Sequence, residues 1–231
     1  TREKTNLIMH FGEGNNAVVK PDNISLAVSK VTEPAKWGFE VPEGAKEFTL
    51  LLSSGTINRY GLILKNEQGI YDRVAIYKNK KESAPLYILE NEKFTTGILD
   101  ETYKDEKIVT ANRNMRLMDL EEDGSKFKLY VSPTMDITMN AFWSPKSLYQ
   151  TIVANVGYPT PTSMIYGKDI DIKAKTMLAS WQASAKWQAD SLNYLMKNEG
   201  YEMVFSHFHN VDLPACRPFF VVISHHPERR P

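Results

Sequence analysis

The first 131 residues contain a succession of short apolar or alternating segments, and this pattern constrains the fold more than any other feature of the sequence. Short segments of this kind, bounded by turn-forming residues, are typical of β-strands. No long segment with helical periodicity interrupts them. Strands at this spacing predict a β-sandwich. The segments are residues 24–31, 48–52, 60–64, 70–77, 86–89, 108–110, 115–120 and 127–131.

Two of the turns between these segments end in glycine. Residues 66–69 end in Gly69, and residues 121–124 end in Gly124. Glycine adopts a positive φ without steric cost, which is what a tight turn between two strands often requires. The sequence therefore predicts two antiparallel hairpins, one around each of these turns.

Alternation also predicts which side chains fill the core of the sandwich. Successive side chains of a strand point to opposite faces, so apolar residues that alternate with polar neighbours share the buried face. Two lysines of the last strand, Lys126 and Lys128, should then face solvent. The residues expected to face inward are Ile24, Leu26, Phe127, Leu129 and Val131.

The pattern changes at Ser144, where helical signals replace strand signals. Ser144 is expected as an N-cap with Pro145 at the first helical position, and this first helix should end at Gly157. A second helix is predicted over residues 172–198. Its apolar residues form two stripes, which are expected to be packing surfaces. The first stripe is Leu178, Trp181, Ala185, Leu192 and Leu195, and the second is Trp187, Ser191 and Tyr194.

An apolar segment at 201–208 follows the second helix and is predicted to be a strand. A helix that leads into an apolar strand is typical of an α/β core. We therefore expect an α+β protein, in which a β-sandwich-like domain is followed by a helix–strand piece of an α/β core. The expected parts are a β-rich domain over 1–143, a helical and α/β segment over 144–213, and an atypical tail over 214–231.

Composition narrows the class of partner and the compartment. Lys plus Arg and Asp plus Glu are both 28, so a net charge of zero gives no reason to expect nucleic acid or an acidic membrane surface. No apolar run approaches the roughly 20 residues of a membrane span. Cys216 is the single cysteine, which excludes an internal disulfide and favours a reducing compartment. We therefore expect a cytoplasmic protein.

The tail 214–231 differs from the rest of the chain. It contains no lysine, although the chain has 20, and it holds four of the 12 prolines. Proline removes backbone donors and discourages both helices and central strands. We expect this tail to be foreign to the fold, and either to pack poorly or to be ordered mainly by contacts with another molecule. The helix before it would then expose an apolar face, which predicts a homodimer through residues 172–208. The alternative is that residues 219–223 add a strand beside 201–208 and close the unit within one chain.

The densest cluster of metal-ligand residue types is His207, His209 and Asp212, at the end of the predicted strand 201–208. Ligands of open α/β sheets bind beyond the carboxyl ends of strands, and carboxylates and imidazoles hold divalent metals. From spacing alone, two histidines on one face of a strand are more often buried and hydrogen-bonded than metal-bound. The cluster becomes a candidate site only with further context.

That context comes from a resemblance over residues 187–212. A helix with Trp187 and Tyr194, then an apolar strand that ends in His-x-His-x-x-Asp, resembles the type I phosphodiesterase/nucleotide pyrophosphatase family of the alkaline phosphatase superfamily. By this resemblance Asp212 matches a metal-binding aspartate, and His207 and His209 lie where they would support the metal site without being ligands. The family's next metal-binding histidine should follow four residues later, where this chain has Cys216.

The resemblance implies phosphoryl transfer with two divalent metals, zinc or manganese, and a phosphorylated small molecule as the substrate. The family also uses a Thr or Ser nucleophile. Thr160 and Thr162 have the right residue type, but they lie in a proline-rich segment where a solvated turn is favoured. His225 and His226 lack the aspartate that precedes the family's later metal-binding histidine. No catalytic residue is therefore assigned.

These observations lead to two hypotheses of different classes. The first is that the chain is a fragment of a metal-dependent phosphoric-ester hydrolase. The intact family acts on a phosphodiester or pyrophosphate, and the fragment is expected to be inactive on its own. The second is a non-catalytic ligand-binding β-sandwich module. Its sugar-binding face would be lined by aromatic residues that are more often core or rim residues. These are Trp37, Tyr60, Tyr77 and Trp143.

Overall fold

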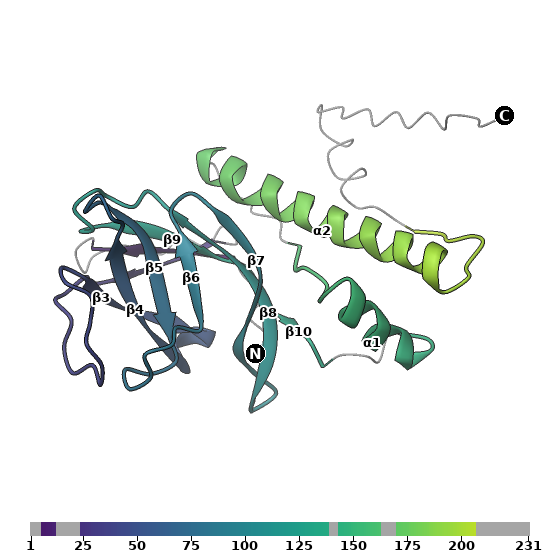
Figure 1. Cartoon of the computed structure of the whole chain (residues 1–231), viewed down its shortest axis with the longest axis horizontal. Helices are drawn as coiled ribbons and strands as arrows, with labels where there is room; N and C mark the ends of the chain where they lie inside the picture. The colour runs from purple at the N-terminus through teal and green to yellow at the C-terminus, as the bar shows by residue number, and fades with distance from the viewer. Residues whose placement is uncertain (1–5, 13–23, 139–142, 163–169, 207–231) are drawn as a thin grey trace.

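The computed structural model describes residues 6–12, 24–138, 143–162 and 170–206, with the backbone alone for 24–28. The described residues form two β-sheets, which pack face to face, and two α-helices, which lie beside one of them (Figure 1). This confirms the expected class, a sheet-rich α+β protein. No described helix combines the length and apolar character needed to cross a membrane.

The first sheet has the strand order β10–β8–β9–β1–β2, with β7 paired to β8. β1 and β2 are parallel, and the other pairs of this sheet are antiparallel. The strands β1, β7 and β10 were not predicted, and β8 is much longer than the two short segments expected within it. The bounds are β1 (Asn6–Phe11), β2 (Ile24–Ser29), β7 (Phe94–Lys104), β8 (Lys107–Met118), β9 (Phe127–Val131) and β10 (Met135–Asp136).

The second sheet is an antiparallel meander in the order β3–β4–β5–β6. A short 3-10 helix, Ser53–Gly55, connects its first two strands. Each of the four strands overlaps a segment predicted from the sequence. Their bounds are β3 (Lys46–Leu52), β4 (Ile57–Lys65), β5 (Tyr71–Tyr77) and β6 (Tyr87–Glu90).

Both predicted hairpins are confirmed. In the turn between β4 and β5, the side-chain oxygen of Asn66 accepts hydrogen bonds from the backbone N–H groups of Gln68 and Ile70, both at 3.0 Å, and Gly69 has a φ of +81°. In the turn between β8 and β9, Gly124 has a φ of +67° and its ideal Cβ would lie 2.9 Å from the ring of Tyr71. Glycine is needed at both positions because the backbone is left-handed there.

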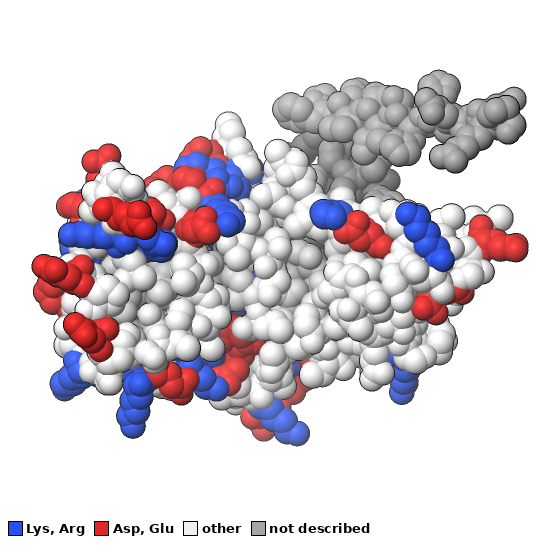
Figure 2. Space-filling view, in the orientation of Figure 1, with Lys and Arg blue, Asp and Glu red and all other residues white. Residues whose placement is uncertain are grey.

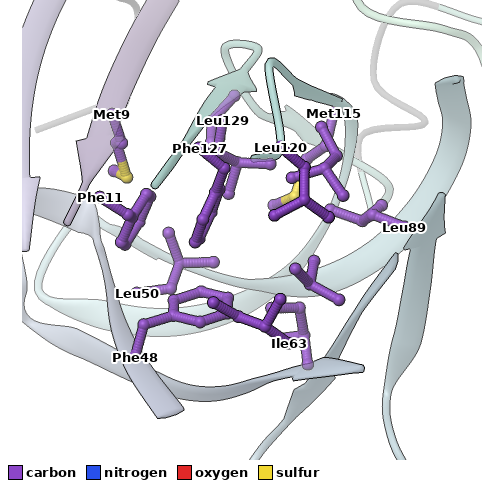
Figure 3. Close-up of a cluster of buried hydrophobic side chains, with 14 of the residues drawn as sticks. Met9, Phe11, Phe48, Leu50, Ile63, Leu89, Met115, Leu120, Phe127 and Leu129 are labelled. Carbon is purple, nitrogen blue, oxygen red and sulfur yellow. The ribbon is translucent and has the colours of Figure 1, made fainter. Parts of the chain in front are cut away.

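The main core lies between the two sheets (Figure 3). The rings of Phe11 and Phe127 stack at 4.4 Å, and Phe48 from the opposite sheet meets both edge-on at 4.9 Å. Phe127, Leu129 and Val131 are buried in this core, as predicted. The lysines behave as expected in part: Lys126 is exposed, whereas Lys128 is half-buried. The side chains of Ile24 and Leu26 lie outside the described residues.

The two helices are α1 (Lys146–Asn155) and α2 (Ile170–Asn198). α1 differs from its prediction by one position, because Pro145 and not Ser144 is the N-cap, and no side chain caps the helix. Its expected end at Gly157 is confirmed, since Gly157 has a φ of +107° and its N–H reaches back to the carbonyl of Val153 at 3.1 Å.

The prediction for the packed face of α2 was wrong in part. The buried residues of α2 are Ile172, Thr176, Ser180 and Ser191, whereas Leu178 of the first predicted stripe is 57% exposed. The second predicted stripe contains Ser191 and lies on the packed side. The packed face of α2 could not be predicted from apolar spacing, because small polar residues, which give no hydrophobic signal, form most of its buried residues.

The predicted strand over 201–208 is also wrong for its described part. Residues 201–206 have no strand pairing, and Met203 and Phe205 are 70% and 89% exposed. An apolar segment becomes a strand only where neighbouring strands accept its backbone hydrogen bonds and cover its side chains. The described residues provide no such neighbour beside 201–206.

Candidate functional site

The residues predicted to bind metal, Asp212 with His207 and His209 beside it, lie outside the described residues. So do Cys216, His225 and His226 of the tail. The described residues contain no group of three or more His, Cys, Asp or Glu side chains that could hold a metal ion. The structure therefore describes the elements that lead to the predicted site, and not the site itself.

Those elements are α2 and the irregular segment 199–206 that follows it. The segment turns back along the helix, and the side-chain amide of Gln188 donates to Ser206 Oγ at 2.6 Å (Figure 1). The preceding residue, Trp187, donates from its indole N–H to the carbonyl of Gly157 at 2.9 Å. The first contact ties the segment 199–206 to α2, and the second ties α2 to the residues that follow α1.

The first sheet holds the α2 region through a row of polar side chains on β8. Asn112 Nδ2 donates to the carbonyl of Pro159, Asn114 Nδ2 donates to the carbonyl of Pro161, both at 3.0 Å, and Arg116 Nη1 donates to the carbonyl of Lys175 at 2.7 Å. The three residues alternate along the strand and so share its outer face. Both asparagines are fully buried.

We refer to this contact between β8, residues 159–161 and α2 as the polar join. The sequence did not predict it, because an Asn-x-Asn-x-Arg alternation is typical of a solvated strand face. The only signal was the alternation itself. The candidate nucleophiles lie in the attached segment, where Thr160 is half-buried and Thr162 exposed, so the segment is held on the sheet and is not a free turn.

An apolar contact supplements the polar join near the start of α2. Ile172 packs against Ile8, Met118 and Tyr130 of the first sheet, and all four are buried. The hydroxyl of Tyr130 donates to the Asn6 side chain at 2.9 Å. The first turn of the helix is therefore anchored to the centre of the sheet.

A charged cluster borders the same contact. Lys175 lies 2.9 Å from Asp119 and 3.4 Å from Glu92, and Glu92 also lies 3.1 Å from Arg116. Hydrogen bonds from Lys128 and Lys175 lower the pKa of Asp119. Burial by itself raises the pKa of Glu92, but the backbone N–H of Asp119 and the two cations outweigh it and lower that pKa. Every charge is matched, so the cluster is an ion-pair network that holds α2.

A second charged cluster is buried between the sheets. Arg59 lies 2.5 Å from Asp100 and 2.7 Å from Glu101, and the hydroxyl of Tyr87 donates to Asp100 at 3.0 Å. Burial opposes the charge of Arg59, but Asp100 and Glu101 raise its pKa overall. Burial, together with the charge of Asp100, raises the pKa of Tyr87 well above its usual value. Lys78 lies 2.8 Å from Glu101, so the two cations and two carboxylates of this cluster balance one another.

The aromatic residues of the second hypothesis do not form one face. The rings of Trp37 and Tyr77 meet at 5.1 Å, and Lys80 lies over the rings of Trp37 and Tyr60. Trp143 instead contacts Tyr149 of α1, with ring centroids 5.4 Å apart. The aromatic residues thus belong to two separate packing clusters.

The group around Trp37 is closed by its own hydrogen bonds. Glu47 accepts from the indole N–H of Trp37 at 2.8 Å, from the backbone of Ala35 at 3.0 Å, and from Lys80. Burial raises the pKa of Glu47, but these donors, Lys80 foremost, lower it overall. Tyr77 is only 5% exposed. This cluster packs the loop around Trp37 onto the outer face of the second sheet.

Comparison with known proteins assigns no family. No protein-family model, no curated protein and no solved structure matches the chain.

Proposed function

We propose that this chain is part of a metal-dependent phosphoric-ester hydrolase. The substrate of the intact enzyme is a phosphodiester or pyrophosphate, and the chain is inactive on its own. The proposal rests on the resemblance of residues 187–212 to the type I phosphodiesterase/nucleotide pyrophosphatase family, in which Asp212 takes the place of a metal ligand. A cytoplasmic location remains part of the proposal.

One observation on the described residues supports the proposal. The long helix α2 forms as expected, but the apolar segment after it stays unpaired, with Met203 and Phe205 exposed. A segment of an α/β core behaves in this way when it lacks the neighbouring strands of its sheet. Once paired, such a strand would carry His207, His209 and Asp212 to its carboxyl end, where α/β sheets place their ligands.

The proposed chemistry assigns one role to this chain. Asp212 would contribute a carboxylate to a zinc or manganese site, and the metal, when bound, would stabilise the negative charge that develops in phosphoryl transfer. The sequence shows neither a nucleophile segment nor a second set of ligands that matches the family. We therefore derive no catalytic step for the chain, and expect it to have no turnover alone.

The gene provides the decisive experiment. The DNA on both sides of the coding region should be sequenced, and any longer product assayed on a chromogenic phosphodiester with zinc or manganese. We expect a Thr or Ser nucleophile segment upstream and a Gly-His or Gln-His after the position of Asp212. The longer product should turn over, and Asp212→Ala should abolish turnover. Flanking sequence without these elements would overturn the proposal.

The 231-residue chain serves as the matched control in the same assay. It should show no turnover with either metal. Clear turnover by this chain alone, abolished by Asp212→Ala, would keep the reaction class but refute the statement that the chain is inactive on its own.

The alternative, a non-catalytic ligand-binding β-sandwich, is less well supported by the contacts of its candidate residues. Tyr77 is buried and the indole N–H of Trp37 is hydrogen-bonded to Glu47. A sugar-binding platform needs an exposed ring face with polar groups free to bind hydroxyls. Glycan binding by the intact chain, lost in Trp37→Ala, would favour this alternative.

A further inference from the structure

Helix α2 is attached to the rest of the protein by a contact that buries little apolar surface. The helix has 29 residues, and its buried side chains are Ile172, Thr176, Ser180 and Ser191. Ile172 is the one large apolar side chain among these four. A contact of this kind gains little from the hydrophobic effect, and polar contacts between parts of one chain permit relative motion. The two sheets, in contrast, share a large apolar core.

The polar join also contains buried polar atoms that the join itself does not satisfy. Asn112 Oδ1, Asn114 Oδ1 and Arg116 Nε have no hydrogen-bond partner among the described residues. The two amides cannot be reversed to pair their oxygens, because their Nδ2 atoms already donate to the carbonyls of Pro159 and Pro161. A buried polar atom without a partner lowers the stability of a contact, and solvent satisfies it once the contact separates. The closed join is therefore only weakly favoured over an open one.

Ion pairs tie the first turns of α2 to the sandwich. Lys175 lies 2.9 Å from Asp119, directly after β8, and 3.4 Å from Glu92. Figure 2 shows acidic and basic side chains next to one another at this end of α2. The side chain of Lys175 is 24% exposed and those of the two carboxylates are about 40% exposed, so dissolved salt screens the attraction. The tie should therefore weaken as the ionic strength rises.

Other hydrogen bonds connect α2 to the segments beside it and do not reach the sheet. Ser180 and Trp187 donate to backbone carbonyls within residues 157–161, at 3.3 and 2.9 Å. Gln188 donates to Ser206 Oγ at 2.6 Å. These bonds are kept when α2 separates from the first sheet, so the segments move with the helix. We refer to residues 157–161, α2 and residues 199–206 as the helical unit.

We propose that the helical unit opens from the first sheet while the sandwich stays folded, and that Lys175 with Asp119 and Glu92 is a salt-sensitive latch for this motion. Opening breaks the hydrogen bonds of the polar join and the ion pairs of the latch. Burial of Ile172 against the sheet and the bonds of the join favour the closed state. The inference is independent of the proposed hydrolase function, because its test measures the opening of α2 and not activity.

The reactivity of a buried thiol measures the opening directly. In a Cys216→Ser background, Ser180→Cys places a thiol on the buried side of α2, and Val131→Cys places one in the core between the sheets. Both wild-type side chains are fully buried. Position 180 lies more than two turns from either end of the helix, so fraying of the ends does not expose it. A thiol reagent reaches each position only when the surrounding contact opens.

We expect Ser180→Cys to be labelled at least about tenfold faster than Val131→Cys, because the helical unit opens without unfolding of the sandwich. The labelling rate of Ser180→Cys should rise severalfold when NaCl is increased from about 0.05 M to about 0.5 M, which shortens the range of the ion pairs. The rate of Val131→Cys should change much less.

Two lysines of α2 provide a matched pair for testing the latch. Lys175 pairs with the sandwich, whereas Lys186 pairs with Asp190 of the same helix at 2.6 Å. Combined with Ser180→Cys, Lys175→Met should raise the labelling rate about fivefold at low salt and remove most of its salt dependence. Lys186→Met should change neither quantity.

Hydrogen exchange of the unmodified chain checks that the introduced cysteine does not itself create the opening. The amides of α2 should exchange faster than those of β4 and β9, and the difference should grow with salt. Three outcomes would overturn the proposal: equal labelling at positions 180 and 131, exchange of α2 only at the rate of β4 and β9, or an unchanged salt dependence in Lys175→Met.

Discussion

The two faces of strand β8 are buried by different kinds of contact. Met115 and Leu117 point into the apolar core between the sheets and are fully buried. Asn112 and Asn114, on the opposite face, are just as buried, but they lie in the polar join beneath residues 159–161. The same strand thus supports one contact by apolar packing and another by directed hydrogen bonds.

The apolar packing and the hydrogen bonds contribute differently to the stability of the fold and to its specificity. A large buried apolar side chain typically contributes several kcal/mol, whereas a neutral hydrogen bond contributes a net of about 1 kcal/mol. Apolar packing tolerates many sequences, but Asn112 and Asn114 each meet one particular carbonyl. The core should therefore set the stability of the sandwich, and the polar join should set where α2 lies upon it.

The largest effect should come from the core itself. Phe127→Ala removes the ring that stacks on Phe11 and meets Phe48, and should reduce the free energy of unfolding by about 3–5 kcal/mol in urea denaturation. Leu51→Ala is the control, because Leu51 is 48% exposed on β3 and its removal should cost no more than about 0.5 kcal/mol. Equal losses in the two variants would mean that the aromatic cluster is not the main source of stability.

A smaller but still large effect is expected from the charge pair between the sheets. Asp100→Ala leaves the buried guanidinium of Arg59 without its main partner and should cost about 3 kcal/mol. The double variant Arg59→Met with Asp100→Ala should recover part of that loss, since no unpaired charge remains. Lys93→Ala, which breaks an exposed pair with Glu90, should be nearly neutral. A double variant worse than the single one would show that the pair itself stabilises the core.

The polar join should respond more weakly and more locally. Asn114→Ala removes the donor to Pro161, but it also removes the buried side-chain oxygen, which has no hydrogen-bond partner among the described residues. The net cost should therefore be about 1 kcal/mol. Hydrogen exchange should accelerate in the first half of α2 and remain slow in β4 and β9. Asn58→Ala, exposed on β4, is the matched control. Faster exchange throughout the sandwich would contradict the separation between core and join.

The smallest effect should be the pH dependence of the ion pairs beside the join. The pKa values of Glu92 and Asp119 are lowered in the folded state. A lowered pKa stabilises the fold above the unfolded value, about 4, and this contribution is lost as the pH falls through the folded value. Both carboxylates are about 40% exposed, so water screens them and roughly 0.5 kcal/mol is expected from each.

Glu92→Gln provides the measurement. Its free energy of unfolding should lie below that of the parent at neutral pH. The difference should shrink as the pH falls through the lowered pKa of Glu92, and vanish where both proteins carry a neutral side chain. Glu67→Gln, in an exposed turn, should match the parent at every pH. A difference that persists in acid would assign the effect to packing and not to charge.

The sequence by itself determined the features that depend on neighbouring residues. The two hairpins follow from glycines at positions that need a positive φ, and the inward face of β9 follows from strict alternation through Phe127, Leu129 and Val131. The existence and extent of α2 followed from its periodicity. Each of these signals is local, because turn geometry and side-chain period are properties of consecutive residues.

Only the tertiary structure decided which surfaces meet. β1 pairs in parallel with β2 and antiparallel with β9, and these two partner strands are about a hundred residues apart in sequence. The polar join converts Asn112 and Asn114 from an apparent solvent face into a buried contact. Local pattern cannot report such contacts, since a polar residue is buried at low cost only where a distant backbone carbonyl accepts its hydrogen bond.

The same reason explains why the predicted strand after α2 does not form in residues 201–206 while the helix does. A helix satisfies its backbone hydrogen bonds within its own sequence, whereas a strand depends on a neighbour supplied by the rest of the fold.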